Sequence, residues 1–226
     1  MMKKNTYIHL AIYLLIIVAC NTKTENNAQS SVSAEQKPEL AQIREEQYDI
    51  KGDSLIFKSA TIENFDLQGK SIDIYWLNEA KDTILYFYRK YDQNQQLIGA
   101  EYYEEGETEP TLDTIFRNED GLKVEASLNA EGQMIWKSTI KVDAAGNEVL
   151  RTYENGKGEY RGLDSLYFDG KNRVIKGFYE NSKGKRSGIK TYEYLTSDEY
   201  DNWMTRNLLV DGALKQVHKQ ILKYYQ

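Results

Sequence analysis

Five glycines recur at a nearly constant interval along the chain. Gly106, Gly132, Gly158, Gly184 and Gly212 lie 26, 26, 26 and 28 residues apart, and each closes a stretch in which apolar and polar residues alternate. Alternation with a period of two is typical of strands, and glycine suits the tight turns between strands. The spacing therefore predicts a repeat protein built from strands.

A second set of turn residues runs between these glycines. It consists of Asp66, Asp92, Asn118, Asp143, Asp169 and Asp201, at intervals of 26, 26, 25, 26 and 32 residues. Two turns in each period mean that each repeat holds two strands, joined as a β-hairpin.

Short turns can join only neighbouring strands, so the hairpins predict an antiparallel meander in sequence order. We expect an all-β fold over residues 48–226, with about 12 strands in a single sheet. Neighbouring strands twist by roughly 20 to 25 degrees, so such a sheet cannot stay flat. The sequence therefore predicts one curled open sheet or an incomplete barrel.

Residues one period apart also predict which side chains share a face. One set is apolar or aromatic: Ile140, Leu166 and Tyr192. The residues directly before them are polar: Thr139, Ser165 and Thr191. We expect the first set on the buried face of the sheet and the second set on the face in contact with water.

The N-terminus has the pattern of a secretory signal peptide. Lys3 and Lys4 precede the run 8–19, which is apolar except for His9 and is short for a membrane span. The run ends at Ile17-Val18-Ala19-Cys20, which resembles the lipobox of bacterial lipoproteins. The resemblance implies cleavage after residue 19 and acylation of Cys20 by diacylglycerol and palmitate-type chains, which anchor stably in pairs. The alternative is a buried free cysteine in a short signal anchor.

Residues 20–47 are expected to form a disordered, lipidated tether, because 21–39 is polar and has no apolar period. Pro38 and the following ELAQIREEQ predict a short helix within its last part. Asn21 stands where an Asp favours retention in the inner membrane. We therefore expect a lipid-anchored envelope protein of the outer membrane, facing either the periplasm or the cell surface.

Two sets of short motifs carry a family resemblance over residues 66–226. Tyr91-Asp92, the run 168–174 (FDGKNRV) and the run 200–203 (YDNW) resemble the turn motif of RHS-type (YD) repeats. The runs 153–157 (YENGK) and 179–184 (YENSKG) look like the MORN-2 repeats of YwqK-type proteins. The resemblance implies a β-sheet scaffold without catalytic groups, and YwqK-type members include proposed antitoxins. The chain lacks the long shell and C-terminal toxin of RHS proteins.

Charge and composition exclude several classes of function. Loss of Lys3 and Lys4 with the signal peptide leaves 27 basic and 35 acidic residues, a net charge of −8, which argues against a nucleic-acid partner. His218 is the only histidine of the mature chain, and we expect it to be an ordinary strand residue. We expect no metal site, no cofactor and no catalytic residue.

The aromatic residues are better candidates for ligand contacts than any pair of acidic residues. They include Trp136, Tyr160, Tyr192 and Tyr194, which a concave sheet would present to a sugar ring or a peptide. The alternative is that they pair across strands and cover the sheet.

Three functions follow from these observations. The first is a membrane-anchored envelope lipoprotein whose repeat sheet is a binding or scaffold surface for a protein or glycan. The second is a periplasmic immunity-type lipoprotein, acidic enough to neutralise a basic toxin. The third, and the least favoured, is a hydrolase of envelope polymers.

Overall fold

A computed structural model describes residues 38–225 except 108 and 120, with the backbone alone for 116–119. The predicted signal peptide, Cys20 and the tether as far as residue 37 lie outside the described residues.

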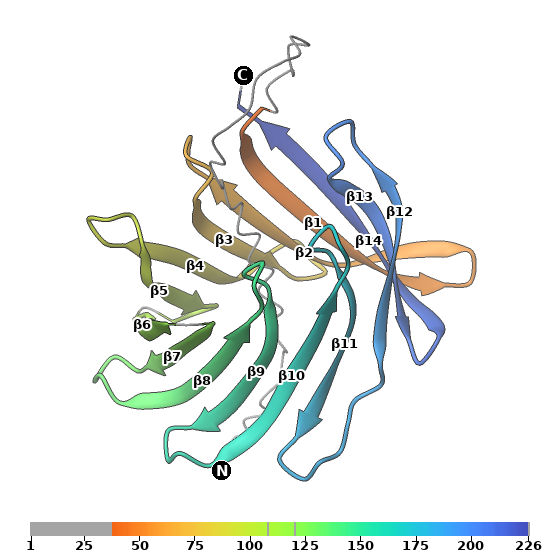
Figure 1. Ribbon diagram of the computed structural model, residues 1–226. Coiled ribbons are helices and arrows are strands. Elements are labelled where there is room, and N and C mark those ends of the chain that lie inside the picture. The colour runs from red at the N-terminus through yellow and green to blue at the C-terminus, as the bar shows by residue number, and fades with distance from the viewer. Residues whose placement is uncertain (1–37, 108, 120, 226) are drawn as a thin grey trace, which may run out of the picture.

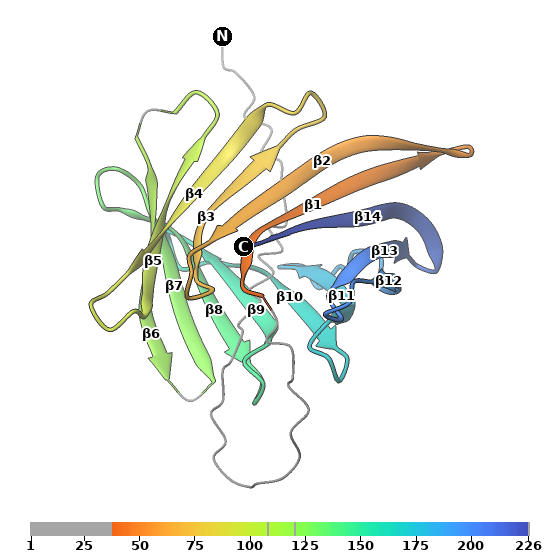
Figure 2. The same ribbon diagram turned by 90° about the horizontal axis from the view of Figure 1, so that it is seen from above.

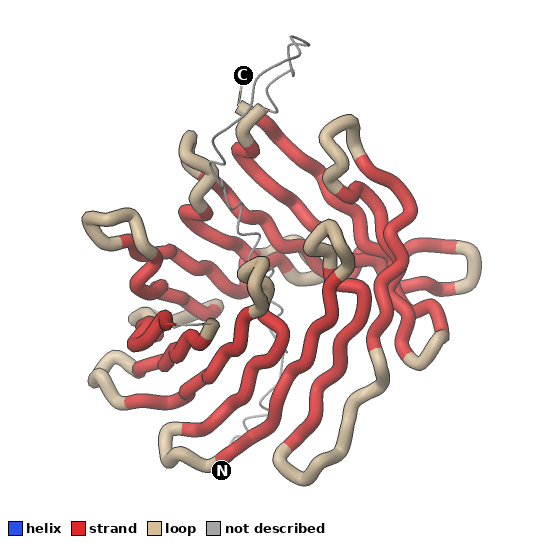
Figure 3. The backbone as a smooth tube through the Cα atoms, viewed as in Figure 1, coloured by secondary structure: helices blue, strands red, loops and turns tan. Residues whose placement is uncertain are grey.

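The described chain folds into strands, and Figure 3 shows loops and strands without a helix between them. The strands are β1 (Leu40–Lys51), β2 (Ser54–Phe65), β3 (Ser71–Leu77), β4 (Thr83–Tyr91), β5 (Leu97–Glu104), β6 (Thr111–Glu119), β7 (Leu122–Leu128), β8 (Met134–Val142), β9 (Glu148–Asn155), β10 (Tyr160–Phe168), β11 (Val174–Asn181), β12 (Lys190–Ser197), β13 (Trp203–Val210) and β14 (Ala213–Tyr224). Each strand pairs antiparallel with the next one, which confirms the predicted meander. This part of the chain has no helix long and apolar enough to cross a membrane.

The sheet closes on itself, because β1 pairs with β14 as well as with β2 (Figures 1 and 2). The β1–β14 register runs from Leu40 opposite Tyr224 to Asp49 opposite Gln216. The prediction of an open sheet or incomplete barrel with about 12 strands was therefore wrong: the structure is a closed barrel of 14 strands. Closure removes the two sheet edges that an open meander would leave unpaired.

The strand that closes the barrel begins inside the stretch predicted to be a tether. β1 starts at Leu40, and the residues predicted to form a helix after Pro38 are strand, so the helix prediction was wrong. Its alternating inner side chains include Glu45, Gln47 and Asp49 in place of apolar residues. The apolar period that identifies a strand in the sequence is therefore absent here.

Most hairpins use one turn, which an Asp or Asn side chain holds. In the turn after β10, Asp169 Oδ1 accepts the backbone N–H groups of Lys171 and Arg173 at 2.8 and 2.9 Å. The fourth residue of this turn, Asn172, has a φ of 59°. The same Oδ1 bonds recur at Asp66, Asp92, Asp143, Asn155, Asn181 and Asp198. This side chain mimics a backbone turn and fixes the hairpin locally.

The predicted turn residues of both sets fall in turns or directly beside them, except Asn118. Asn118 lies inside β6, opposite Lys123. All five glycines of the first set have φ between 74° and 81°, a backbone that other residues adopt only with strain. In the second set, Asp201 occupies the left-handed position of its turn, with φ 63°, and Asp198 supplies the capping oxygen. This shift accounts for three of the six additional residues in the last interval.

The predicted difference in burial between the two faces is clear at Ile140 alone. The other five residues of the two predicted sets are all half-buried: Leu166, Tyr192, Thr139, Ser165 and Thr191. Ile140 is 1% exposed on the inner face of β8. A compact apolar cluster lines the inner wall of β3 to β5, formed by Ile74, Trp76, Leu85, Phe87, Ala100 and Tyr102. Strands elsewhere in the barrel place charged groups on the same inner face.

Replacing Gly158 by Ala tests the role of the turn glycines. Gly158 has a φ of 76°, and an added Cβ would meet no atom within 4 Å, so only backbone strain opposes the change. We expect the free energy of unfolding to fall by about 1–2 kcal/mol, measured by urea denaturation. Gly170→Ala is the matched control, because this turn glycine also has open space but lacks a positive φ. Equal effects of the two substitutions would contradict the role of Gly158.

Candidate functional site

The inner face of the barrel carries buried charged and polar side chains. Arg206 is 3% exposed, His218 4%, Asp164 7%, Gln220 7% and Arg89 8%. Buried charges are costly unless they are paired and hydrogen-bonded, so the partners of these groups determine what the interior can do.

One charged group joins the first strand to the last two. Glu45 on β1 accepts a hydrogen bond from Arg206 Nη2 on β13 at 2.8 Å. Its Oε1 also lies 2.7 Å from His218 Nδ1 on β14, the distance at which Nδ1–H donates. We call Glu45, Arg206 and His218 the closure cluster, because it links β1 to β13 and β14 where the barrel closes.

Aromatic rings pack around the guanidinium of the closure cluster. The Arg206 Cζ atom lies 4.3 Å from the ring centroid of Trp203 and 4.6 Å from that of Tyr192. Arg206 Nη1 donates to the Tyr194 hydroxyl at 3.3 Å. Contacts of a cation with ring faces gain strength where water is excluded, so these rings stabilise the buried charge.

The closure cluster holds Glu45 in its charged form. Burial opposes ionisation of this carboxyl, but the Arg206 charge and the hydrogen bond from His218 outweigh burial and lower the pKa to about 2. Glu45 is therefore a fixed anion at neutral pH and is unsuited to donating a proton.

A second charged group lies on the inner faces of β7 and β9. Arg151 donates to Glu125 at 2.8 Å and to both carboxylate oxygens of Glu148 at 2.6 and 2.8 Å. Burial raises the pKa of Glu125, but the charges of Arg151 and Lys123 outweigh burial and lower the pKa overall. These groups neutralise one another and form a structural network.

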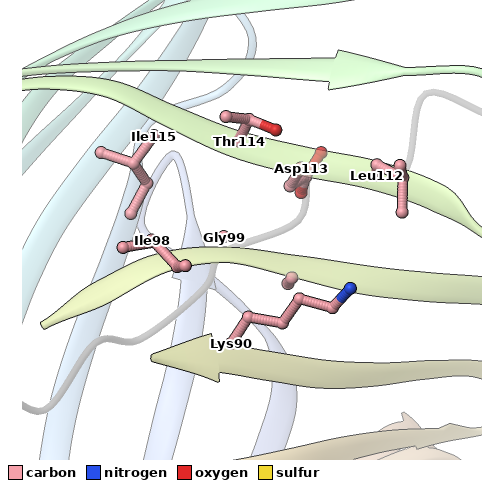
Figure 4. A pocket seen from close by; sticks show the side chains of 8 residues that line it. Lys90, Ile98, Gly99, Leu112, Asp113, Thr114 and Ile115 are labelled. Carbon is pink, nitrogen blue, oxygen red and sulfur yellow. The ribbon is translucent and has the colours of Figure 1, made fainter. Parts of the chain in front are cut away.

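Asp113 on β6 is a half-buried carboxyl with weakened acidity. Burial raises its pKa to about 6, although Ser127 Oγ donates to it at 2.5 Å. Asp113 lies at a pocket of about 280 Å³ between β5 and β6 (Figure 4). The other lining residues are Lys90, Ile98, Gly99, Ala100, Leu112, Thr114 and Ile115. The pocket is just below the usual size of small-molecule sites, which begins at about 300 Å³.

The described residues contain no group of three or more His, Cys, Asp or Glu side chains that could hold a metal ion.

The outer face of β3 to β5 carries a row of tyrosines in register. Tyr75 lies opposite Tyr86, and Tyr86 lies opposite Tyr103. Their ring centroids are 4.8 and 6.2 Å apart, with interplanar angles of 31° and 27°. Tyr88, two residues beyond Tyr86, is 45% exposed. We call these four residues the outer tyrosine face.

The rings of Tyr75, Tyr86 and Tyr103 pack against one another, and Tyr88 lies exposed beside them. Burial of Tyr86 between its neighbours, together with the adjacent Tyr75, raises the pKa of its hydroxyl to about 12. The hydroxyl therefore stays protonated and able to donate. Tyr88 lies between Asp73 on β3 and Glu101 on β5, which pair with it across the sheet.

The outer wall also carries charged residues near the middle of several strands. They are Lys58 on β2, Lys137 on β8, Lys176 on β11, Glu193 on β12 and Lys219 on β14. Lys219 shows the geometry clearly, because it is exposed between the buried His218 and Gln220. In a transmembrane barrel each lysine near the bilayer midplane would cost about 2–4 kcal/mol.

The structure separates the aromatic residues predicted to contact a ligand. Tyr192 and Tyr194 lie on the inner face of β12 against Arg206. Trp136 lies on β8, paired with Ser127 and Asn155. Tyr160 is 43% exposed at the first residue of β10. A ligand-binding role for these four residues, like acylation of Cys20, stays a prediction.

Sequence reasoning missed two groups of residues. His218 lies in the last strand, as predicted, but its contact with Glu45 in the closure cluster was not foreseen. Comparing residues one 26-residue period apart did not find the outer tyrosine face. Two strands of a hairpin run in opposite directions from their turn, so residues that pair across them are not one period apart. Counting outward from the turn 78–82 alone places Tyr75 opposite Leu85, and a register shift between Trp76 and Leu77 moves its partner to Tyr86.

No protein-family model matches the sequence, and no curated protein matches it. Among solved structures, the chain is similar to a porin-like protein from Bacteroides uniformis. The sequence identity is 9% and the TM-score 0.50, over 81% of this chain and 98% of that one. A likeness at this identity concerns the fold alone. The resemblance to RHS-type and MORN-2 repeats stays a prediction.

Replacing Arg206 by Met tests the closure cluster. The change leaves Glu45 buried without its main counter-charge, and we expect the free energy of unfolding at neutral pH to fall by about 3–5 kcal/mol. Urea denaturation measures the change. Adding Glu45→Gln to the same chain should restore part of the loss. The control is Lys171→Met, which removes an exposed partner of Asp201 and should lower the free energy of unfolding by about 0–1 kcal/mol. An equal loss in both variants would contradict the stabilising role of the closure cluster.

Replacing Asp113 by Asn tests the buried carboxyl. Its folded pKa of about 6 lies above the ordinary value of 3.8, so the folded protein binds this proton more tightly than the unfolded chain does. The stabilisation from the neutral form is present at low pH and is lost as the pH rises through about 6.

We therefore expect Asp113→Asn to be more stable than the parent chain above pH 6, and the difference to shrink as the pH falls toward 4. The measurement is the difference in unfolding free energy between the two chains across this range. A difference that does not vary with pH would contradict the raised pKa.

Proposed function

We propose that the protein is a lipid-anchored binding protein of the cell envelope that takes a protein partner on its outer tyrosine face. The observation that carries the proposal is the row of Tyr75, Tyr86 and Tyr103, held in register on three neighbouring strands. Tyrosine gives a large, rigid contact area at low entropic cost, and it is enriched in protein interfaces.

The stacking favours a protein over a glycan. A sugar ring would use the face of an aromatic ring, but the faces of Tyr86 lie against Tyr75 and Tyr103. Tyrosine hydroxyls also suit hydrogen bonds to the backbone and side chains of a protein. Because neighbouring rings already hold each other in place, little conformational freedom is lost on binding.

The envelope location rests on the lipobox-like sequence that ends at Cys20. Exposed mid-strand charges such as Lys176 and Lys219 favour a barrel that stands in water beside the membrane, with the lipid on Cys20 as its anchor. An outer-membrane location fits this arrangement. The immunity-type function is the special case in which the protein partner is a toxin.

Photo-crosslinking in the native cells tests the proposal. A benzoylphenylalanine in place of Tyr88 should give a discrete crosslinked product, because this residue is the exposed member of the outer tyrosine face. The same group in place of Tyr167, which is 47% exposed on β10, should not give that product. Tyr86→Ala should weaken capture of the crosslinked partner by roughly tenfold or more.

Tyr86→Phe is the matched variant, because it keeps the stacked ring and removes only the hydroxyl. It should lose less affinity than Tyr86→Ala. The same products from positions 88 and 167, or full capture by Tyr86→Ala, would contradict the proposal.

A further inference from the structure

One junction of the barrel is held by far fewer main-chain contacts than the others. β11 and β12 pair at two positions, Lys176 with Thr191 and Gly177 with Lys190. Every other pair of neighbouring strands is in register over at least four residue pairs, and β12 pairs with β13 over seven. We call the junction between β11 and β12 the seam.

The two strands diverge beyond these pairs. From Tyr192 to Ser197, β12 pairs with β13 on one side and has no ladder partner on the β11 side within the described part of the chain. On the other side of these two pairs, β11 bonds to residues that precede β12. There the Ser187 N–H donates to the Tyr179 carbonyl at 2.8 Å. The side of β12 that faces β11 therefore has no ladder pairs over Tyr192–Ser197, six of its eight residues.

Along Tyr192–Ser197, side chains connect β12 to β11 in place of backbone hydrogen bonds. The Tyr194 hydroxyl donates to the Val174 carbonyl at 2.9 Å, and the Arg173 guanidinium lies 4.5 Å from the Tyr194 ring centroid. Lys171 and Asp201 form an exposed ion pair at 2.5 Å between the two neighbouring turns. A few side-chain contacts of this kind can be exchanged without unfolding the barrel.

The exposed rim of the seam has a definite chemistry. Ile175 on β11 is 38% exposed, and Leu195 on β12 is 54% exposed. Glu193 is exposed on the outer face of β12 between them. A ligand here meets an apolar border, a carboxylate and a row of main-chain groups.

We propose that the seam accepts an extended segment of a protein partner, which adds to β12 as a strand along Tyr192–Ser197. Only another polypeptide backbone presents donors and acceptors at the spacing of an unpaired strand, which is why exposed edges recruit strands. The segment would place a basic residue beside Glu193 and an apolar residue beside Leu195. This site is separate from the outer tyrosine face and stands whether or not that face binds a partner.

The binding of a model strand tests the proposal directly. The probe is a synthetic peptide with the sequence of residues 173–181, RVIKGFYEN, because β11 itself supplies the side chains that fit beside β12. The protein is the mature chain with Cys20→Ser. Hydrogen–deuterium exchange is measured with and without 1 mM peptide, and we expect exchange over Tyr192–Ser197 to slow by about tenfold.

The control is the same peptide with N-methyl groups on alternate residues. It keeps every side chain and removes the backbone N–H donors along one edge of the peptide strand. It should give no added protection. Three outcomes would overturn the proposal: no slowing with the parent peptide, equal slowing with the methylated peptide, or slowing confined to other strands.

Discussion

The contact between the first strand and the last strand determines the form of this molecule. A meander of hairpins can end as an open sheet, and nothing in its local turns forces the ends to meet. Here β1 and β14 pair over most of their length, and Glu45 binds Arg206 and His218 across the junction. These partners lie 161 and 173 residues from Glu45 in sequence. The closure cluster therefore gives the barrel a specific register for closing, because a one-residue slip would turn Glu45 away from Arg206.

Closure divides the residues into two populations with different roles. Inside, charged groups such as Arg151 are neutralised by partners on neighbouring strands, and the apolar cluster on β3 to β5 supplies the compact part of the core. Outside, exposed lysines alternate with buried residues, and the tyrosines of β3 to β5 form an ordered aromatic row. The interior serves stability, and the exterior is the surface available to partners.

The sequence predicts the local structure well and the long-range structure poorly. Turn residues such as Asp169 and Gly158 act within five residues of chain, so their spacing located the hairpins and the strand directions correctly. The closing strand was missed because Glu45, Gln47 and Asp49 replace the apolar residues by which a strand is recognised. The outer tyrosine face was missed because its register depends on mirror symmetry about turns. Nothing in the sequence near His218 indicates its partner on β1.

The closed register can be tested by an engineered disulfide. Arg44 and Ile221 are directly opposite on β1 and β14, at a spacing that a disulfide can span. In a Cys20→Ser chain with Arg44→Cys and Ile221→Cys, we predict nearly complete disulfide formation on mild oxidation of the folded protein. A chain with Arg44→Cys and Lys176→Cys, whose second position lies on β11, should stay reduced. Equal and low oxidation of the two chains would show that the ends of the meander do not meet, and would contradict the closed barrel.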